Sequence, residues 1–142
     1  DNIAERAAIT AYDIRYGWGA RTGGDGGYDI GIPDGTVPGM IKLLPAAINV
    51  SLFRPYIWEV KNPLMLLAAA ESIVVLILSL YLFIYKKGII GLLNDPFLVF
   101  CFLFALLFAF AVGVSTANFG TLMRYKIPMF PFYGICLVLL KK

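Results

Sequence analysis

The sequence predicts an all-α membrane protein with two to three transmembrane helices, preceded by an extramembrane segment able to form a β-hairpin. Hydrophobic residues make up 60% of the 142 residues and charged residues only 15%, whereas an average soluble domain has about 45–50% and about 25%. Two apolar runs are long enough to cross a bilayer. Most of the charged residues lie in the first 63 positions, ahead of those runs.

Composition also excludes several classes of function. The formal net charge of +3 comes from scattered basic residues with no Lys/Arg run longer than two, so we expect no nucleic-acid partner. Histidine is absent, which removes the usual general base and the commonest metal ligand. The two cysteines, Cys101 and Cys136, lie in apolar runs and are interpreted as buried, inert thiols. We therefore expect no metal site and no cofactor.

The first predicted span covers residues 64–85. It is about 22 residues long with a single charge, Glu71, and Lys86 and Lys87 follow it. At 1.5 Å per residue this length crosses a hydrocarbon core of roughly 30 Å. Asn62 and Pro63 precede it, and proline is tolerated in the first turn of a helix.

Two further apolar runs follow. Residues 97–117 carry no charge and predict a second span. Residues 127–140 are only 14 long and contain Pro128 and Pro131, so they predict a tilted or re-entrant helix, or a span inside which the chain has been cut. Since the chain starts with Asp and its last residues, Lys141 and Lys142, follow directly on this run, we expect it to be part of a larger membrane protein, or a processed or incomplete one.

The remaining residues divide into two segments. Residues 38–63 are apolar but interrupted by prolines, so we interpret them as interfacial, with aromatic side chains at headgroup level. Residues 1–37 are expected to be extramembrane. Within them, apolar and polar residues alternate from Thr10 to Ala20, which predicts a strand. The stretches "RTGGDGG" and "YDIGI" would supply a turn and a return strand.

Arg124 and Lys126 form the first candidate site. They lie in a short connection between two apolar runs, which places them near the bilayer surface. The planar guanidinium of arginine suits phosphate and diphosphate groups, and lysine adds a point charge. Binding to ordinary lipid headgroups explains the two cations equally well. Counting cations near the spans gives four on each face, so the positive-inside rule does not assign the orientation.

A second candidate site surrounds Arg54. This residue is a further candidate for a diphosphate or lipid headgroup, and the neighbouring Tyr56 and Trp58, together with Tyr125, are candidates for stacking on a sugar or at the membrane interface. Two acidic residues are candidate catalytic groups. Glu71 lies inside the first predicted span, where an ionisable residue indicates a functional site, although a structural ion pair with Arg124, Lys126 or Lys61 is the preferred interpretation. Glu59 is the other.

Two stretches in this order, "LLPAAINVSLFRPYIWEVKNPLMLLAAAES" and "NFGTLMRYKIPMFPF", resemble the C-terminal region of bacterial multi-span envelope-polysaccharide assembly membrane proteins, of the O-antigen polymerase/ligase-like or polyprenyl-phosphate glycosyltransferase-like kind. The resemblance covers residues 43–132. It implies a multi-pass protein of the bacterial inner membrane that handles an undecaprenyl-diphosphate-linked oligosaccharide at the periplasmic face, by glycosyl transfer or polymerisation.

The resemblance also implies roles for the candidate residues. Arg54 and Arg124 would stabilise the charge that develops on the leaving diphosphate, and Glu71 or Glu59 would activate the acceptor hydroxyl. Such proteins have many more helices, so we expect this chain to be inactive alone and to pack against the remaining helices of a longer chain or against other membrane subunits. The alternative is a non-catalytic small subunit or scaffold of a larger membrane complex.

Overall fold

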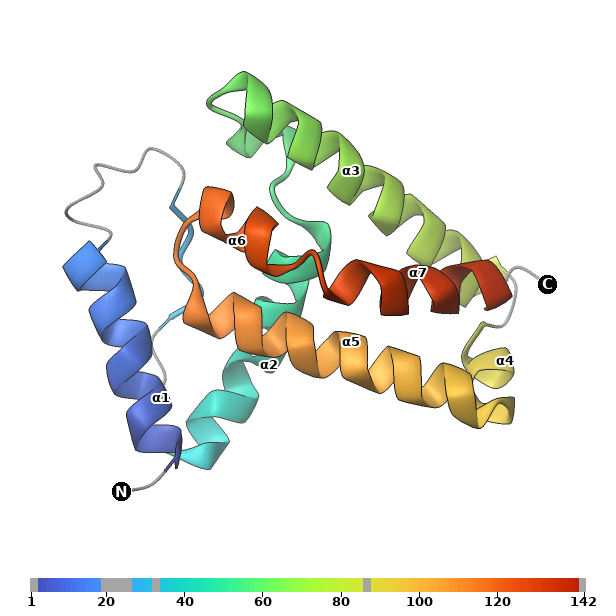
Figure 1. The fold of residues 1–142 in the computed structure, drawn as a ribbon, viewed down its shortest axis with the longest axis horizontal. Helices are drawn as coiled ribbons and strands as arrows, with labels where there is room; N and C mark the ends of the chain where they lie inside the picture. The colour runs from blue at the N-terminus through green and yellow to red at the C-terminus, as the bar shows by residue number, and fades with distance from the viewer. Residues whose placement is uncertain (1–2, 19–26, 32–33, 86–87, 141–142) are drawn as a thin grey trace.

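The computed structural model describes residues 3–18, 27–31, 34–85 and 88–140 (Figure 1). The described chain is helical, with irregular connections. Its elements are α1 (Ile3–Tyr12), which continues as a π-helical segment (Asp13–Trp18), α2 (Val37–Phe53), a 3₁₀ turn (Ile57–Glu59), α3 (Pro63–Leu80), which continues as a π-helical segment (Tyr81–Tyr85), α4 (Gly88–Asn94), α5 (Pro96–Ser115), α6 (Phe119–Tyr125) and α7 (Met129–Leu140).

Helix α5 lies at the centre of the packing. It contacts α2 along one side and α7 along another, and α2 also contacts α3. Figure 1 shows α5 and α7 side by side, α3 running at an angle to them and approaching the C-terminal end of α7, and α1 at the end of the molecule where α5 finishes. Small residues allow this close approach: Ala105 and Ala109 of α5 are fully buried, as is Ala47 of α2.

Short polar side chains determine where four of the helices begin. The side chain of each N-cap residue accepts a hydrogen bond from a free backbone amide of the first turn, and so satisfies a donor that has no partner within the helix. The N-caps of α2, α3, α5 and α6 are Thr36 (3.1 Å), Asn62 (2.8 Å), Asp95 (2.9 Å) and Asn118 (2.7 Å). A proline follows the cap in the first turn of α2, α3 and α5, where its missing amide costs nothing.

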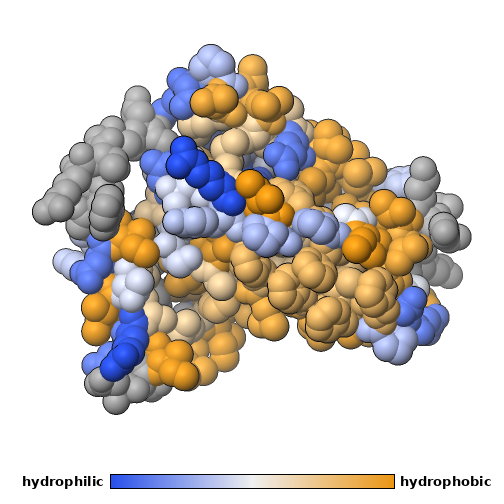
Figure 2. Space-filling model, viewed as in Figure 1, coloured by the Kyte–Doolittle hydropathy of each residue, from blue (hydrophilic) through white to orange (hydrophobic). Residues whose placement is uncertain are grey.

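The predicted membrane spans are confirmed by length and composition. Residues Pro63–Ile84 and Pro96–Ser115 are each long and apolar enough to cross a membrane. Helices α6 and α7 together pass the same test, but they are bent by 68°, so they form either one broken span or a re-entrant loop. Figure 2 shows the corresponding surface: hydrophobic side chains cover α5 and α7, and hydrophilic ones gather toward both ends.

The predicted strand at residues 10–20 is wrong, because residues 10–18 are helical. The alternation of apolar and polar residues does not correspond to burial, since Tyr12 and Tyr16 are both about half exposed. Their rings lie 4.8 Å apart, as residues four apart on a helix do. The segment packs instead through Ala4 and Ala11, which are buried seven residues apart on one helical face.

The predicted return strand has a different partner. The Tyr28 amide donates a hydrogen bond of 3.0 Å to the carbonyl of Ala117, and Gly27 forms an isolated antiparallel bridge with Asn118. Residues 27 and 28 therefore pair with the connection between α5 and α6. Residues 21–26, which carry most of the predicted turn, lie outside the described residues. Of the segment predicted to be interrupted by prolines, residues 38–53 belong to the continuous helix α2, which runs through Pro45 and ends before Pro55.

Candidate functional site

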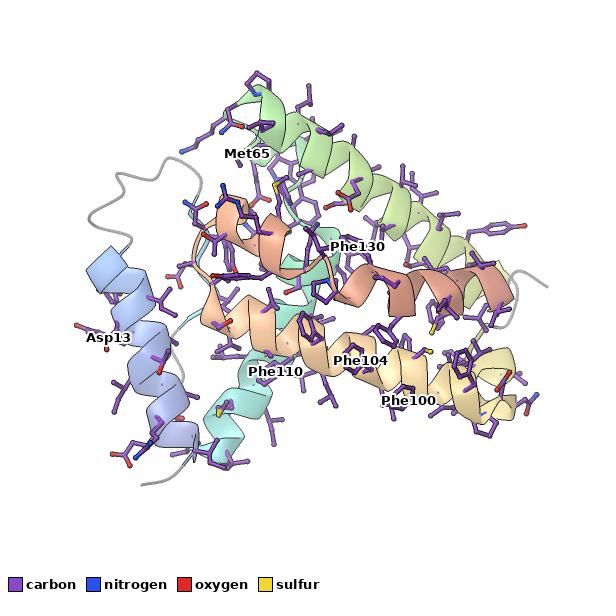
Figure 3. The ribbon with its side chains drawn as sticks, in the orientation of Figure 1. Asp13, Met65, Phe100, Phe104, Phe110 and Phe130 are labelled. Carbon is purple, nitrogen blue, oxygen red and sulfur yellow. The ribbon has the colours of Figure 1, made fainter. Side chains whose placement is uncertain are left out.

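The bend between α6 and α7 places Lys126 inside the protein. Its side chain is only 1% exposed, and within the described part of the chain its Nζ has no hydrogen-bond partner. The ammonium lies 5.1 Å from the centre of the Phe130 ring, beside the bend (Figure 3). Glu71 of α3 is the acidic residue whose charge acts on it. Lys126 is one of the three partners that the sequence offers for Glu71, and it is the one whose ammonium the charge of Glu71 affects.

This arrangement leaves the ammonium with unused bonding capacity. A lysine can donate three hydrogen bonds, and burying a charge without hydrogen bonds is costly. A ring face and a carboxylate beyond hydrogen-bond range compensate for only part of this cost. An anion with several acceptor oxygens, such as a phosphate, would supply the missing acceptors.

Arg124 and Tyr125 have a different environment from Lys126. Arg124 lies in the last turn of α6 and is exposed, and Tyr125 is 57% exposed. A cation in the last turn of a helix is favoured by the partial negative charge of the free carbonyl groups. In the short connection, Lys126 is therefore buried and Arg124 lies at the surface, although the two residues were predicted to form one site.

Arg54 is held by an ion pair. Its Nε donates a hydrogen bond of 3.0 Å to Oε2 of Glu59, and its Nη2 contacts Oε1 of the same carboxylate. The Tyr56 amide donates a further hydrogen bond of 2.9 Å to Oε2. Both oxygens of Glu59 are therefore engaged, and the two charged side chains are each 19% exposed.

Aromatic rings surround the guanidinium of Arg54. Its Cζ lies 5.4 Å from the ring centre of Phe119 and 5.9 Å from those of Tyr28 and Tyr56. Each contact is within the range of a cation–π interaction. The backbone is fixed as well, since the buried hydroxyl of Ser72 in α3 donates a hydrogen bond of 3.1 Å to the Arg54 carbonyl. We call Arg54, Glu59 and these three rings the arginine cluster.

The ion pair shifts the pKa values of both partners. The hydrogen bond to Glu59 raises the pKa of Arg54 and outweighs the opposing effect of burial. Burial acts to raise the pKa of Glu59, but the hydrogen bonds from Arg54 and from the Tyr56 amide outweigh it, so the pKa of Glu59 is lowered from its ordinary value of 4.5. Glu59 is therefore ionised at neutral pH and is poorly suited to accept a proton.

The rings of Tyr56 and Trp58 stack beside the arginine cluster, with their centres 4.8 Å apart. Trp58 is 81% exposed, and the Tyr56 hydroxyl donates a hydrogen bond of 3.1 Å to Asn49. An exposed indole held in one orientation suits the headgroup layer of a membrane or the apolar face of a sugar. The two aromatic residues singled out in the sequence thus lie together, whereas Tyr125 belongs to α6.

Sequence reasoning missed Tyr28, Phe119 and Ser72. Tyr28 is buried, its ring packs 5.1 Å from that of Phe119, and its hydroxyl contacts Thr116. Neither the position of Tyr28 in a glycine-rich stretch nor its sequence neighbours indicate that its ring belongs to the arginine cluster. In the part of the chain that the structure describes, no group of three His, Cys, Asp or Glu residues could hold a metal ion.

No family model, no curated protein and no solved structure matches the chain. The resemblance to envelope-polysaccharide assembly proteins stays a prediction.

Proposed function

We propose that the chain is part of an integral inner-membrane protein that handles a polyprenyl-diphosphate-linked glycan at the periplasmic face, by glycosyl transfer or polymerisation. The observation that carries the proposal is the buried Lys126 ammonium, which has no hydrogen-bond partner among the described residues and lies at the bend between α6 and α7, in a broken span or a re-entrant loop. A lipid phosphate is an anion that a membrane would supply to a cation between two apolar helices. Its oxygens would complete the bonding of the ammonium.

The candidate residues take different roles in this proposal. Lys126 binds the phosphate from inside the protein, and the exposed Arg124 approaches the same headgroup from the surface. The arginine cluster has a positioning role, because Arg54 already has a carboxylate partner. Glu71 is a better candidate than Glu59 for activating an acceptor hydroxyl, since both oxygens of Glu59 are engaged. Trp58 offers a face to a sugar ring.

The proposal is tested by replacing the gene in the cell of origin and measuring surface glycan. Lys126→Met and Arg124→Ala should each lower the glycan at least tenfold, because a hydrogen bond to a charged group contributes about 1.5–3 kcal/mol and about 1.4 kcal/mol is a factor of ten. Lys42→Ala is the matched control: it removes an exposed cation of α2, distant in sequence from the bend.

Two results would contradict the proposal. Glycan at the parental level with both variants inserted in the membrane at the normal amount would exclude a headgroup role. A fixed stoichiometry with other membrane subunits, lost in the same variants while glycan is unchanged, would instead support the non-catalytic scaffold.

A further inference from the structure

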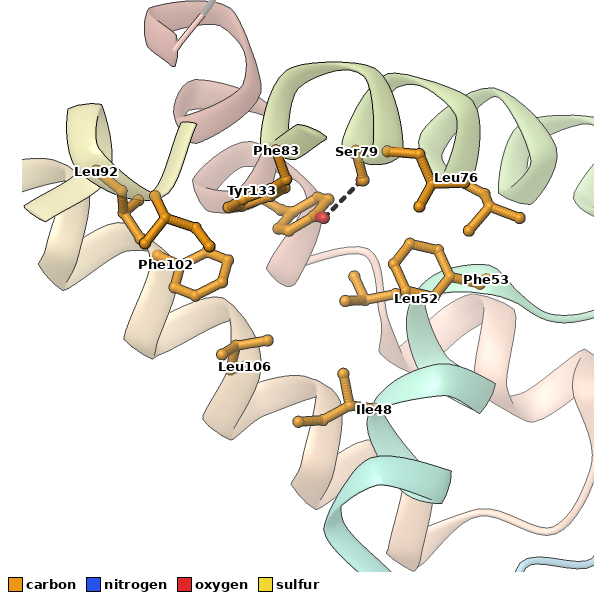
Figure 4. A pocket seen from close by; sticks show the side chains of 12 residues that line it. Ile48, Leu52, Phe53, Leu76, Ser79, Phe83, Leu92, Phe102, Leu106 and Tyr133 are labelled. Atoms are coloured by element: carbon orange, nitrogen blue, oxygen red, sulfur yellow. Dashed lines mark hydrogen bonds between the residues drawn. The ribbon is translucent and has the colours of Figure 1, made fainter. Parts of the chain in front are cut away.

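Helix α3 has a buried face and an exposed face beside it. The buried face is formed by Met65, Ala68, Ser72 and Ser79. On the same inward side, Leu76 and Ser79 line a pocket of about 510 Å³ between α2, α3, α4, α5 and α7 (Figure 4). The exposed face includes Leu64, Leu67, Glu71, Val74 and Leu78. We call these five residues the α3 stripe.

The spacing of the α3 stripe is that of a helix-packing seam. Its members follow one another at intervals of three, four, three and four residues, so they lie along one side of the helix. This is the spacing of the a and d positions along which two helices pack. The stripe residues at positions 64, 67, 71 and 78 each precede a buried residue, so the stripe lies about 100° around the helix from the buried face. The described elements leave this seam uncovered.

Glu71 is the central residue of the α3 stripe and lies near the middle of the candidate span. The span Pro63–Ile84 has its midpoint between residues 73 and 74, about 4 Å along a helix from Glu71. The side chain of Glu71 is exposed and, among the described residues, makes no hydrogen bond or ion pair. The ammonium of Lys126, on which its charge acts, is buried and makes no hydrogen bond to it. When the span crosses a membrane, this carboxylate faces outward at the depth of the hydrocarbon layer.

An outward-facing carboxylate at this depth needs a partner. Acidic residues inside membrane spans face other helices or a water-filled cavity and pair with another group, because hydrocarbon offers no hydrogen bond. Protonation does not remove this need, since a carboxylic acid still has a donor and acceptors. A water-filled path does not suit the α3 stripe, because its other four members are apolar. A helix that covers the stripe and donates to Glu71 satisfies both the carboxylate and the apolar residues.

The charge of Glu71 indicates the chemistry of the covering helix. A lysine or arginine at the same depth would form a charge-assisted hydrogen bond with the carboxylate, and apolar residues above and below it would pack on the rest of the stripe. A second copy joined through the same face would place two Glu71 carboxylates opposite each other, where like charges repel. Helix α5, the other candidate span, has no charged residue to offer.

We infer that the α3 stripe binds a membrane-spanning helix of a different protein, an apolar helix with one lysine or arginine opposite Glu71. The inference goes beyond the proposed function, because it concerns what covers α3 and not what the bend between α6 and α7 binds. It holds equally for a protein that handles a glycan and for a scaffold.

Photo-cross-linking in membranes of the cell of origin tests the inference. The photoreactive amino acid p-benzoylphenylalanine replaces Leu67 or Val74 in the full-length protein, and the cross-linked peptides are identified by mass spectrometry. We expect a cross-link to an apolar span of a different protein that contains a lysine or arginine. Leu66 is the matched control, because it is also exposed but lies about 100° around the helix from Leu67. Cross-linking from position 66 should be at least fivefold weaker.

Charge reversal tests the contact at Glu71. At equal amounts of protein in the membrane, Glu71→Lys should lower cross-linking from position 67 at least tenfold, and Glu71→Gln at least threefold. Replacing the partner's cation by glutamate should restore cross-linking in Glu71→Lys, which a defect in the folding of α3 would not allow. Glu71→Gln keeps the shape of the side chain and provides the test where Glu71→Lys does not insert.

Three results would overturn the inference. Adducts with lipid alone would show that hydrocarbon covers the α3 stripe. A cross-link to a second copy, or to another segment of the same chain, would show that the protein covers this face itself. A partner span without a cation, or cross-linking that is unchanged in both Glu71 variants, would show that the carboxylate does not select the partner.

The glycan assay separates this inference from the role proposed for Glu71 toward an acceptor hydroxyl. Loss of glycan in Glu71→Gln with cross-linking unchanged in both Glu71 variants overturns the helix contact and retains that role. Loss of cross-linking with glycan unchanged retains the helix contact and removes the role in activation.

Discussion

Gly113 of α5 lies directly against the backbone of Ala47 in α2. A Cβ atom at Gly113 would overlap the Ala47 carbonyl oxygen and lie 2.8 Å from the carbonyl carbon. Ala47 is fully buried, and the two helices contact along much of their length. Small residues at helix crossings allow such backbone approach in membranes, where van der Waals packing holds helices together.

Gly113→Ala should therefore separate α2 from α5. Because the atoms that the new methyl meets are backbone atoms, which cannot rotate away, we expect a loss of about 1–3 kcal/mol in the free energy of unfolding. Denaturant titration of the purified protein in detergent, followed by circular dichroism, measures it. Gly134→Ala is the matched control, since a Cβ there meets nothing within 4 Å. It should be neutral or stabilising by up to about 1 kcal/mol, and an equal loss in both variants would refute the explanation.

The Ser51 hydroxyl makes a second link between the same helices. It is fully buried and donates a hydrogen bond of 2.6 Å to the carbonyl of Ala109 in α5. Ser51→Ala should cost about 0.6 kcal/mol and no more than about 1.7, the range for hydrogen bonds between membrane helices. Ser115→Ala removes an exposed hydroxyl that is bonded within its own helix. In the same denaturant titration it should lower the free energy of unfolding by less than Ser51→Ala does.

The ion pair between Arg54 and Glu59 predicts a pH dependence. Since the pKa of Glu59 is lowered on folding, its stabilising contribution is complete above about pH 4.5 and is lost as the pH falls through the lower folded-state pKa. We expect the contribution to be about 1 kcal/mol or less, because both side chains are partly solvated.

Trp58 provides the optical signal for this titration. It stacks on Tyr56, which is bonded to Glu59, so its emission should change as Glu59 is protonated. A Trp18→Phe background isolates the signal. Glu59→Gln should remove the transition, and a transition that persists in that variant would show that another group causes it.

Lys126→Met should leave stability equal or increase it. The substitution removes a buried charge that has no hydrogen-bond partner within the described chain, while the methionine side chain fills nearly the same volume. Lys126→Ala should be less stable than Lys126→Met by about 1–3 kcal/mol, because it leaves a cavity. Thermal unfolding in detergent compares them. Arg124→Met, at an exposed position, should lie within about 0.5 kcal/mol of the parent.

Glu71 and Lys126 should be energetically coupled. In a double-mutant cycle, we expect Glu71→Gln to lower the free energy of unfolding of the parent by about 0.5–3 kcal/mol more than it lowers that of Lys126→Met. In the Lys126→Met background the carboxylate of Glu71 has no lysine charge opposite it, so its removal should matter less. Additive effects of the two substitutions on the free energy of unfolding would show that the two charges do not interact.

Much of the fold could be predicted from local patterns. The spans at residues 64–85 and 97–117 agree closely with the helices observed at Pro63–Ile84 and Pro96–Ser115, because apolar length is a property of the run itself. The short third run corresponds to α7, which is bent by 68° from α6 in a broken span or a re-entrant loop, so the choice between a tilted helix, a re-entrant helix and a span cut short stays a prediction. The strand over residues 10–20 was wrong because period-two alternation in a short segment competes with helical packing through small residues.

The composition of the arginine cluster could be predicted only in part from the sequence. Tyr56, Trp58 and Glu59 follow Arg54 closely, so their association is local. Tyr28 and Phe119 are far from Arg54 along the chain, yet their rings contact its guanidinium. No periodic pattern connects residues at such separations.

The sequence by itself determined that this protein has membrane-spanning helices, where they begin, and that cations lie between two of them, because apolar length, capping residues and charge are properties of neighbouring positions. Only the tertiary structure decided that Arg124 is exposed while Lys126, two residues later, is buried without a hydrogen-bond partner in the described chain. That difference depends on the angle of the bend and on what packs against it, both of which are set by distant residues.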